Sequence, residues 1–245
     1  MNNAIILADK RTGSTFLQEC LNSHPNITCY DEMFMRGNKE KRRGQYLYNY
    51  MKRTKNMNHK QYLKWLFSNE GAICFRLMYP HLDNNKPLFD VIRNERIPII
   101  HLIRKNHLNH FISSQTKQQQ KVNLDVNNIV NNLNFLNNKI EFHRKQFKTK
   151  TEYMEIYYED MFGEIEGKKK GVENYGAFNI KSKQITYLSD KYVDKICKFL
   201  GVEKKDLYSN VTKRNSWNIW KHIKNEQQAK QALKESKWEG LINDN

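Results

Sequence analysis

The chain has 245 residues, 12% of them aromatic, and its 42 lysine and arginine residues against 26 aspartate and glutamate residues give a formal net charge of +16. This length suits one large domain with a sizeable core, and no apolar run approaches the ~20 residues that a membrane-spanning helix needs. The positive charge favours an anionic partner, which leaves a nucleotide, a nucleic acid, an anionic membrane surface or an acidic sugar as candidates.

Four cysteines, Cys20, Cys29, Cys74 and Cys197, lie far apart and form no CxxC pair. We expect them to be reduced and mostly buried, and we expect no zinc site. The chain enters an apolar segment without the charged and then apolar layout of a signal peptide. These features predict a soluble protein of the cytoplasm.

The segment 4–8, AIILA, is a continuous apolar run that predicts a strand buried on both faces of a parallel sheet. A polar turn follows from Asp9 to Gly13, and a helix is predicted from about Ser14 to the region of Pro25. A helix start after a buried strand presents unpaired N–H groups and the positive end of the helix dipole, so we predict a phosphate or sulfate ester here. The residues that add charge, close backbone approach or hydroxyl donors are Lys10, Arg11, Gly13, Ser14 and Thr15.

This turn differs from the phosphate loop of kinases and ATPases, G-x-x-x-x-G-K-[ST]. Ala8 stands where the first glycine of that pattern falls, and Ser14 stands where its lysine falls. The positive charge comes before Gly13, as Arg11, and not after it. A plain strand-to-helix turn with a capping serine therefore stays an alternative.

The next segments contain a predicted loop and a basic stretch. Residues 24–34 include Pro and Asn and are predicted to be irregular. The stretch 36–60 is rich in lysine and arginine, with Glu40 as its single acid, and fits either a solvated surface or a basic rim around an anionic ligand. Asn58 is predicted to cap a helix that stops near Gly71.

Apolar runs at 72–79, 99–103 and 153–158 predict three further strands, the first with Arg76 set among apolar neighbours. Capping residues and helical spacing predict helices from Pro87 to about Asn94, from Asn106 to about Gln119, across 123–147, from Ser189 to Gly201 and through much of a basic tail at 212–233. Strands that alternate with helices predict an α/β fold: a central parallel sheet, right-handed crossovers and helices on both faces. Ligands of such folds bind beyond the carboxyl ends of the strands, where the first turn, Arg104 and Glu159-Asp160 would gather.

Three blocks of sequence together resemble the sulfotransferases that depend on PAPS (3'-phosphoadenosine-5'-phosphosulfate). They are KRTGSTFLQECLNSHPNITCYDEMF at 10–34, IIHLIRKNHLNHFISSQ at 99–115, and YYEDMF with the later KICKFLGV. The likeness is greatest to bacterial carbohydrate sulfotransferases of the nodulation-factor and trehalose kinds. The strand FRLMY matches one that carries lysine more often than arginine in the family, and the segment 163–183 matches nothing in it.

The resemblance implies one sulfotransferase domain with a P-loop-like fold over 1–245, a basic helical segment near 36–70 and a basic helical tail near 212–245. It implies transfer of a sulfuryl group from PAPS to a hydroxyl or amine, with release of PAP, and a carbohydrate or another small molecule as acceptor. Arg11, assisted by Lys10, would neutralise charge on the leaving phosphate. The residues that would bind the cofactor are Arg11, Thr12, Gly13, Ser14, Thr15, Arg104, Ser113, Lys213 and Arg214.

Within this implied mechanism Arg104 and Ser113 would hold the 3'-phosphate, and Glu32 would take the proton of the acceptor. The alternatives are an acid-paired Arg104 with Ser113 exposed, and an ion pair between Glu32 and Arg36. No metal is implied, because the chain shows no convincing acidic metal-binding motif.

Two other classes of function remain open from the sequence. An ATP-dependent kinase of small molecules would need a lysine after Gly13 and a clear metal-binding acid, and the chain shows neither. A nucleic-acid-binding module would explain the charge of +16, but no helix-turn-helix, zinc or RRM pattern is present. We therefore expect no nucleic-acid partner, and the identity of the acceptor and the oligomeric state stay open.

Overall fold

The computed structural model describes residues 1–34, 55–116, 121–162, 185–210 and 219–243. These residues belong to two compact units, which are described separately below. The first unit contains Met1–Ile103 and Phe147–Thr212, and the second contains Arg104–Gln146 and Lys213–Asn245.

The first unit is built on a five-stranded sheet with the order β2-β3-β1-β4-β5, in which every neighbouring pair is parallel. The strands are β1 (Ala4–Ala8), β2 (Ile27–Tyr30), β3 (Ala72–Met78), β4 (Ile99–Ile103) and β5 (Tyr153–Tyr157). Every residue of β1, β3 and β4 is buried, as the continuous apolar runs predicted. The predicted α/β fold with a central parallel sheet is confirmed.

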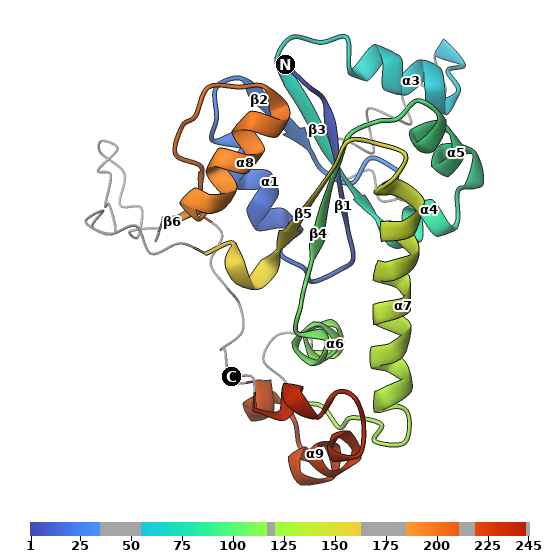
Figure 1. The fold of residues 1–245 in the computed structure, drawn as a ribbon, viewed down its shortest axis with the longest axis vertical. Helices are drawn as coiled ribbons and strands as arrows, with labels where there is room; N and C mark the ends of the chain where they lie inside the picture. The colour runs from blue at the N-terminus through green and yellow to red at the C-terminus, as the bar shows by residue number, and fades with distance from the viewer. Residues whose placement is uncertain (35–54, 117–120, 163–184, 211–218, 244–245) are drawn as a thin grey trace. The chain divides into compact units, whose positions relative to one another are not determined.

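Helices cover both faces of this sheet (Figure 1). On one face, α1 (Ser14–Asn22) and α8 (Asp190–Leu200) share a core with Ile6 of β1 and Ile100 of β4. On the other lie α3 (His59–Leu66), α4 (Tyr79–Asp83) and α5 (Lys86–Asn94). There the ring of Phe75 lies 5.7 Å from that of Phe34 and 6.1 Å from that of Phe67, centroid to centroid.

Most predicted helix ends are confirmed at the atomic level. Asn58 and Gln61 form a reciprocal capping box at the start of α3, and Pro87 lies in the first turn of α5. Gly201 ends α8 in the left-handed conformation, with φ of 65°. Ser189 precedes α8 as predicted, but the prediction that its side chain caps the helix is wrong. Its hydroxyl donates instead to the backbone oxygen of Asp160 at 2.8 Å.

The prediction of an irregular loop at 24–34 is wrong, because residues Ile27–Tyr30 form β2. Ile27 and Cys29 are buried and Thr28 is exposed, but four residues are too few for this alternation to stand out in the sequence. β2 is an edge strand, and the side-chain amide of Asn22 occupies its open side. The amide donates to the oxygen of Cys29 at 2.9 Å and accepts from its N–H at 2.7 Å, so it bonds as a neighbouring strand would.

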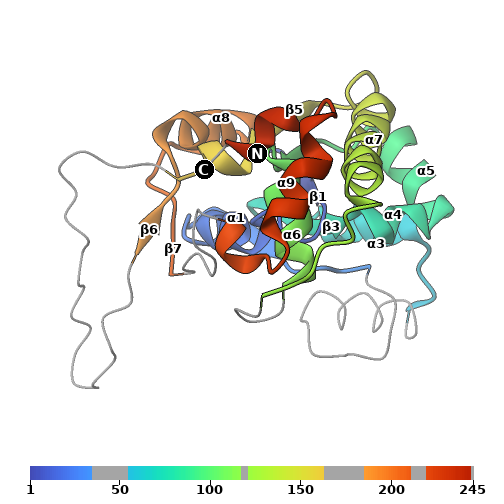
Figure 2. The same ribbon diagram turned by 90° about the horizontal axis from the view of Figure 1, so that it is seen from below.

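A short antiparallel ribbon of β6 (Thr186–Tyr187) and β7 (Tyr208–Ser209) also escaped prediction. β7 lies beside α1 (Figure 2). The hydroxyl of Ser209 donates to Glu19 Oε2 at 2.7 Å, and the N–H of Tyr208 donates to Ser23 Oγ at 3.1 Å. These polar contacts fix the ribbon to the helix that begins at the predicted anion site.

The second unit is helical in the part that the structure describes. Its elements are α6 (His107–Gln115), α7 (Ile129–Phe147, whose last residue belongs to the first unit), α9 (Glu226–Lys234) and the short 3-10 helices η2 (Ile219–His222) and η3 (Glu239–Ile242). α6 ends before the predicted Gln119, and α7 begins after the predicted residue 123. Their shared core contains Leu108, Ile112, Leu124, Ile129, Leu133, Trp220, Ile223, Ala229 and Leu233. None of the described helices is long and apolar enough to cross a membrane.

Candidate functional site

The loop between β1 and α1 has the backbone conformation of an anion-binding nest. Within residues 9–14, all of which the structure describes, φ is positive at Arg11 (66°) and Gly13 (85°) only. The sign of φ therefore alternates from Arg11 to Ser14, where the helix begins. Alternation of this kind turns successive N–H groups toward one side of the chain and forms a concave site for an oxyanion.

Asp9 and Thr12 hold this loop in shape. The N–H of Lys10 donates to Asp9 Oδ1 at 2.7 Å, and the hydroxyl of Thr12 donates to the backbone oxygen of Asp9 at 2.8 Å. Thr12 is buried, whereas Lys10 and Arg11 are exposed. The hydroxyl of Thr12 thus has a structural role in the loop, and its predicted contact with a cofactor stays a prediction.

Gly13 is required by its surroundings as well as by its φ. A Cβ atom at this position would lie 2.6 Å from the ring of Tyr158 and 2.9 Å from the side chain of Met161. Tyr158 begins η1 (Tyr158–Asp160), which follows β5 directly. Gly13 is therefore needed where the loop packs against the ring of Tyr158, and its predicted close approach to an oxyanion stays a prediction.

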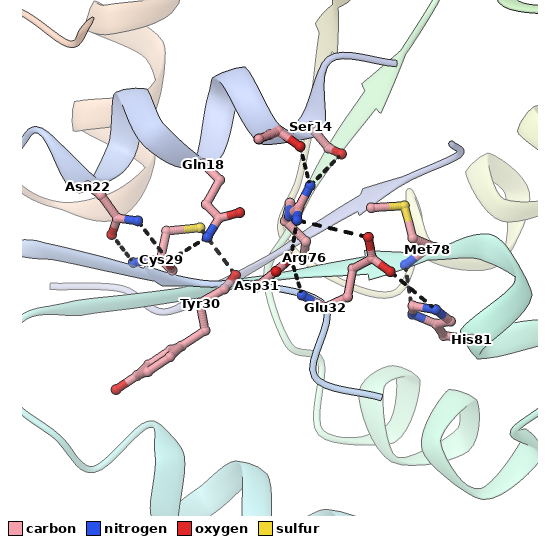
Figure 3. A network of polar contacts seen from close by, with 11 residues as sticks. Ser14, Gln18, Asn22, Cys29, Tyr30, Asp31, Glu32, Arg76, Met78 and His81 are labelled. Atoms are coloured by element: carbon pink, nitrogen blue, oxygen red, sulfur yellow. Dashed lines mark hydrogen bonds and ion pairs between the residues drawn. The ribbon is translucent and has the colours of Figure 1, made fainter. Parts of the chain in front are cut away.

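Arg76 connects the start of α1 to the carboxylates that follow β2 (Figure 3). Its Nη1 donates to Thr15 Oγ1 at 2.8 Å and to Ser14 Oγ at 3.2 Å. Its Nη2 pairs with Asp31 and lies 3.9 Å from Glu32 Oε1. Arg76 is 5% exposed, and its Nε has no hydrogen-bond partner among the residues that the structure describes.

The register of the sheet explains why these groups meet. Arg76 stands opposite Ile6 of β1, and Ile6 belongs to the core that α1 covers, so the guanidinium rises on the face of α1. β3 lies between β1 and β2 in the sheet. Because parallel strands end at one edge, the chain leaving β2 brings Asp31 and Glu32 to the edge at which α1 begins.

The second oxygen of Glu32 faces a histidine. Glu32 Oε2 lies 3.7 Å from Nε2 of His81, and the two side chains are 15% and 11% exposed. The other ring nitrogen of His81 accepts from the N–H of Met78 at 3.4 Å. The carboxylate of Glu32 is therefore flanked by a guanidinium and an imidazole, a setting that suits a group that binds and releases a proton.

The thiols of Cys29 and Cys74 are not nucleophiles at neutral pH. Burial raises the pKa of Cys29 well above its ordinary value, and the neighbouring Cys74 adds to the effect. Burial likewise raises the pKa of Cys74 to about 12. Both side chains therefore stay neutral, and the chemistry of the site belongs to its carboxylates, cations and N–H groups.

The remaining predicted residues lie in the second unit. Arg104 follows β4 directly and Ser113 lies on α6, whose first turn is capped by Asn106. Arg104 and Ser113 are each 8% exposed, so the alternative with an exposed Ser113 is wrong. Whether these two residues share a pocket with the loop of the first unit stays a prediction. The predicted residues Lys213 and Arg214, and Arg36 with most of the basic stretch 36–60, lie outside the described residues.

Sequence reasoning passed over three residues of the cluster: Arg76, Asp31 and His81. The signal for Arg76 was present, because an arginine inside a fully apolar strand must be paired or face a ligand. Asp31 follows β2, and the predicted loop at 24–34 contains no strand end that would single out this residue. Nothing in the local pattern around His81 points to Glu32, since their contact is purely tertiary.

No protein-family profile matches the chain, and no curated protein matches it in sequence. Among solved structures it is similar to a sulfotransferase from Alicyclobacillus acidocaldarius, with 10% sequence identity and a TM-score of 0.44. The similar region covers 100% of this chain and 97% of that chain.

Proposed function

We propose that this protein transfers a sulfuryl group from PAPS to a hydroxyl or amine of a carbohydrate or another small molecule and releases PAP. The observation that carries the proposal is the position of Arg76, which binds Ser14 and Thr15 at the nest and pairs with the carboxylates at 31–32. A nest for an oxyanion and a candidate base thus belong to one cluster. The three sequence blocks that resemble PAPS-dependent sulfotransferases support the same assignment.

In this proposal the nest holds the 5'-phosphosulfate. As the acceptor oxygen bonds to sulfur, the bond from sulfur to the phosphate oxygen breaks, and its electron pair stays on PAP. Arg11 and Lys10 neutralise the charge that develops there, since catalysis of such transfers consists mainly of positioning and charge stabilisation. Arg76 adds a buried guanidinium next to the hydroxyls of Ser14 and Thr15, and so adds positive charge beside the nest.

Glu32 takes the proton of the acceptor as the new bond forms. A carboxylate within hydrogen-bond reach of the acceptor hydroxyl can accept its proton. Arg104 and Ser113 hold the 3'-phosphate, the group that distinguishes PAPS from ATP. Lys213 and Arg214 would add positive charge around the nucleotide.

Thermal unfolding in the presence of PAP, ATP–Mg²⁺ or duplex DNA tests the class of ligand. A ligand that binds only the folded state at about 100 times its Kd stabilises that state by about 2.7 kcal/mol, which raises Tm by about 5–10 °C for a chain of this size. We expect PAP to give the largest shift. A larger shift with ATP–Mg²⁺ would favour a small-molecule kinase, a larger shift with DNA would favour a nucleic-acid-binding module, and no shift with PAP would contradict the proposal.

The acceptor is identified by incubation with PAPS and a panel of sugars, lipids, peptides and small amines. Mass spectrometry then detects the added sulfuryl group and the accompanying PAP. We expect at least one carbohydrate or other small hydroxyl compound to be modified in a PAPS-dependent manner. Release of PAP and inorganic sulfate without any modified acceptor would show transfer of the sulfuryl group to water, with the acceptor absent from the panel, whereas unchanged PAPS throughout would contradict the reaction.

A further inference from the structure

His81 is carried on a helix that the sheet holds in place. α4 begins directly after β3, the strand that contains Arg76. Its first residue, Tyr79, is buried, and the hydroxyl of Tyr79 lies 2.5 Å from Nε2 of His101 on β4. α4 is thus held in two ways: by its direct connection to β3 and by the contact of Tyr79 with His101 on β4. The imidazole of His81 is therefore presented to Glu32 from a rigid position.

The contact with Met78 selects the tautomer of His81. Because Nδ1 accepts from the N–H of Met78, it carries no proton of its own, and in a neutral imidazole the proton then lies on Nε2. This assignment follows from the hydrogen-bond network. The nitrogen that faces Glu32 Oε2 is therefore a donor.

The two oxygens of Glu32 are oriented from different elements. Oε1 faces Nη2 of Arg76 on β3, and Oε2 faces Nε2 of His81 on α4. The charged groups around this carboxylate also include Asp31, which pairs with the same guanidinium nitrogen. Arg76 also binds Ser14, Thr15 and Asp31, and His81 contacts Glu32 from a second element, α4.

We propose that His81 is a positioning residue: its Nε2–H, at 3.7 Å from Oε2 of Glu32, acts by electrostatic attraction, without a direct hydrogen bond, and keeps the carboxylate in the orientation that receives the proton of the acceptor. The inference rests on the proposed function, in which Glu32 is the base. The proposal assigns different roles to the side chains of His81 and Glu32. The lone pair of Nδ1 is directed at the N–H of Met78, so the imidazole orients the base and Glu32 binds the proton.

Three substitutions at one position test this role. Gln places an amide donor near the position of Nε2, Asn places one near Nδ1, and Leu removes both. We expect His81→Leu and His81→Asn to lower kcat by about 10–100-fold, the usual range for loss of a residue that orients a reactive group. His81→Gln should keep kcat within about threefold of the wild type, and Kd for PAP should change less than about twofold in all three.

The pH profile of kcat separates positioning from a merely structural role. Loss of a donor to the carboxylate favours its neutral form, so the acidic limb should move to higher pH in His81→Leu and return in His81→Gln. His59→Gln is the matched control, because His59 on α3 also meets a side chain, with its Nε2 at 3.2 Å from Nδ2 of Asn85. We expect this control to leave kcat and its pH profile unchanged.

The outcomes distinguish the inference from the proposed function. A wild-type protein that transfers no sulfuryl group from PAPS overturns the proposed function. A wild-type enzyme that works while His81→Leu keeps full kcat overturns the role of His81 and leaves the function standing. Equal losses in His81→Gln and His81→Asn with an unmoved acidic limb also overturn it, and they assign His81 to the fold.

Discussion

Nη1 of Arg76 donates a hydrogen bond of 2.8 Å to Oγ1 of Thr15, although 61 positions separate these residues in the chain. The bond ties the middle of a buried strand to the first turn of α1. It exists because β3 is the direct neighbour of β1 and because Arg76 stands in register with Ile6 on the face that α1 covers. Through this bond and the pairing with Asp31, one guanidinium connects the start of α1 to the residues that follow β2.

Replacement of Arg76 should lower the free energy of unfolding. Arg76→Met leaves Asp31 without its buried partner, and breaking such a pair costs about 3 kcal/mol of unfolding free energy. Arg76→Lys should cost less, but a lysine cannot reach the hydroxyls and the carboxylate together. Urea denaturation measures the loss, and Lys86→Met, which breaks an exposed pair with Asp90, is the control. Equal losses for Arg76→Met and the control would contradict the structure.

Glu32→Gln should preserve binding and abolish turnover. The amide keeps the size of the side chain but cannot take a proton, and loss of a general base lowers the rate by about 10²–10⁴-fold. We expect kcat to fall within this range while Kd for PAP stays within about twofold. A variant that retains most of its kcat would exclude Glu32 as the base.

Arg104→Ala should weaken PAP selectively. A hydrogen bond to a charged group contributes about 1.5–3 kcal/mol, which corresponds to about 10–100-fold in Kd. AMP lacks the 3'-phosphate, so its Kd should change little. Titration calorimetry with both ligands tests this, and equal losses for PAP and AMP would remove Arg104 from the 3'-phosphate site.

Gly13→Ala should destabilise the fold for two separable reasons. A non-glycine residue in the left-handed region costs about 1–2 kcal/mol, and the new Cβ would lie 2.6 Å from the Tyr158 ring. We expect a total loss of about 3 kcal/mol, part of which Tyr158→Leu restores in the double variant. Gly240→Ala is the control, because no atom lies within 4 Å of its added Cβ. A double variant whose losses simply add would show that the ring does not constrain this position.

The buried cysteines should make stability fall at high pH. All four are free and buried, and burial raises the pKa of Cys74 to about 12, against about 8.5 for a thiol in the unfolded chain. Because the pKa of Cys74 is higher in the folded state, the contribution of its neutral thiol to the free energy of unfolding is complete below about pH 8.5 and is lost as pH rises toward 12. In this range the free energy of unfolding falls by about 1.4 kcal/mol per pH unit for each such thiol.

Denaturation of the wild type and Cys74→Ala between pH 8 and pH 11 measures this slope. The variant should lose stability less steeply with pH by about 1.4 kcal/mol per unit, whatever its stability at pH 8. The native protein should also resist thiol reagents at pH 7.5 until it is unfolded. Equal slopes in the two proteins, or fast labelling of the native state, would contradict the buried, neutral thiols.

The sequence by itself determined the scaffold and the first half of the site. Continuous apolar runs identified β1, β3 and β4, since such runs are stable only when buried on both faces. The capping residues Asn58 and Asn106 located the starts of α3 and α6, and Pro87 located the start of α5. The strand–turn–helix around Gly13 was also predicted, because turns and helix starts depend on residues that are adjacent in the chain, whereas Glu32 was named from the resemblance to sulfotransferases.

Only the tertiary structure decided which side chains meet. β2 forms a strand because its backbone pairs with β3 on one side and bonds to the side chain of Asn22 on the other. Neither contact can be predicted from the four residues of β2 alone. The pairing of Arg76 with the start of α1 depends on strand order and register, and the approach of His81 to Glu32 depends on where α4 leaves the sheet. Contacts between residues far apart in the chain arise from packing, and local patterns of charge and hydropathy do not encode them.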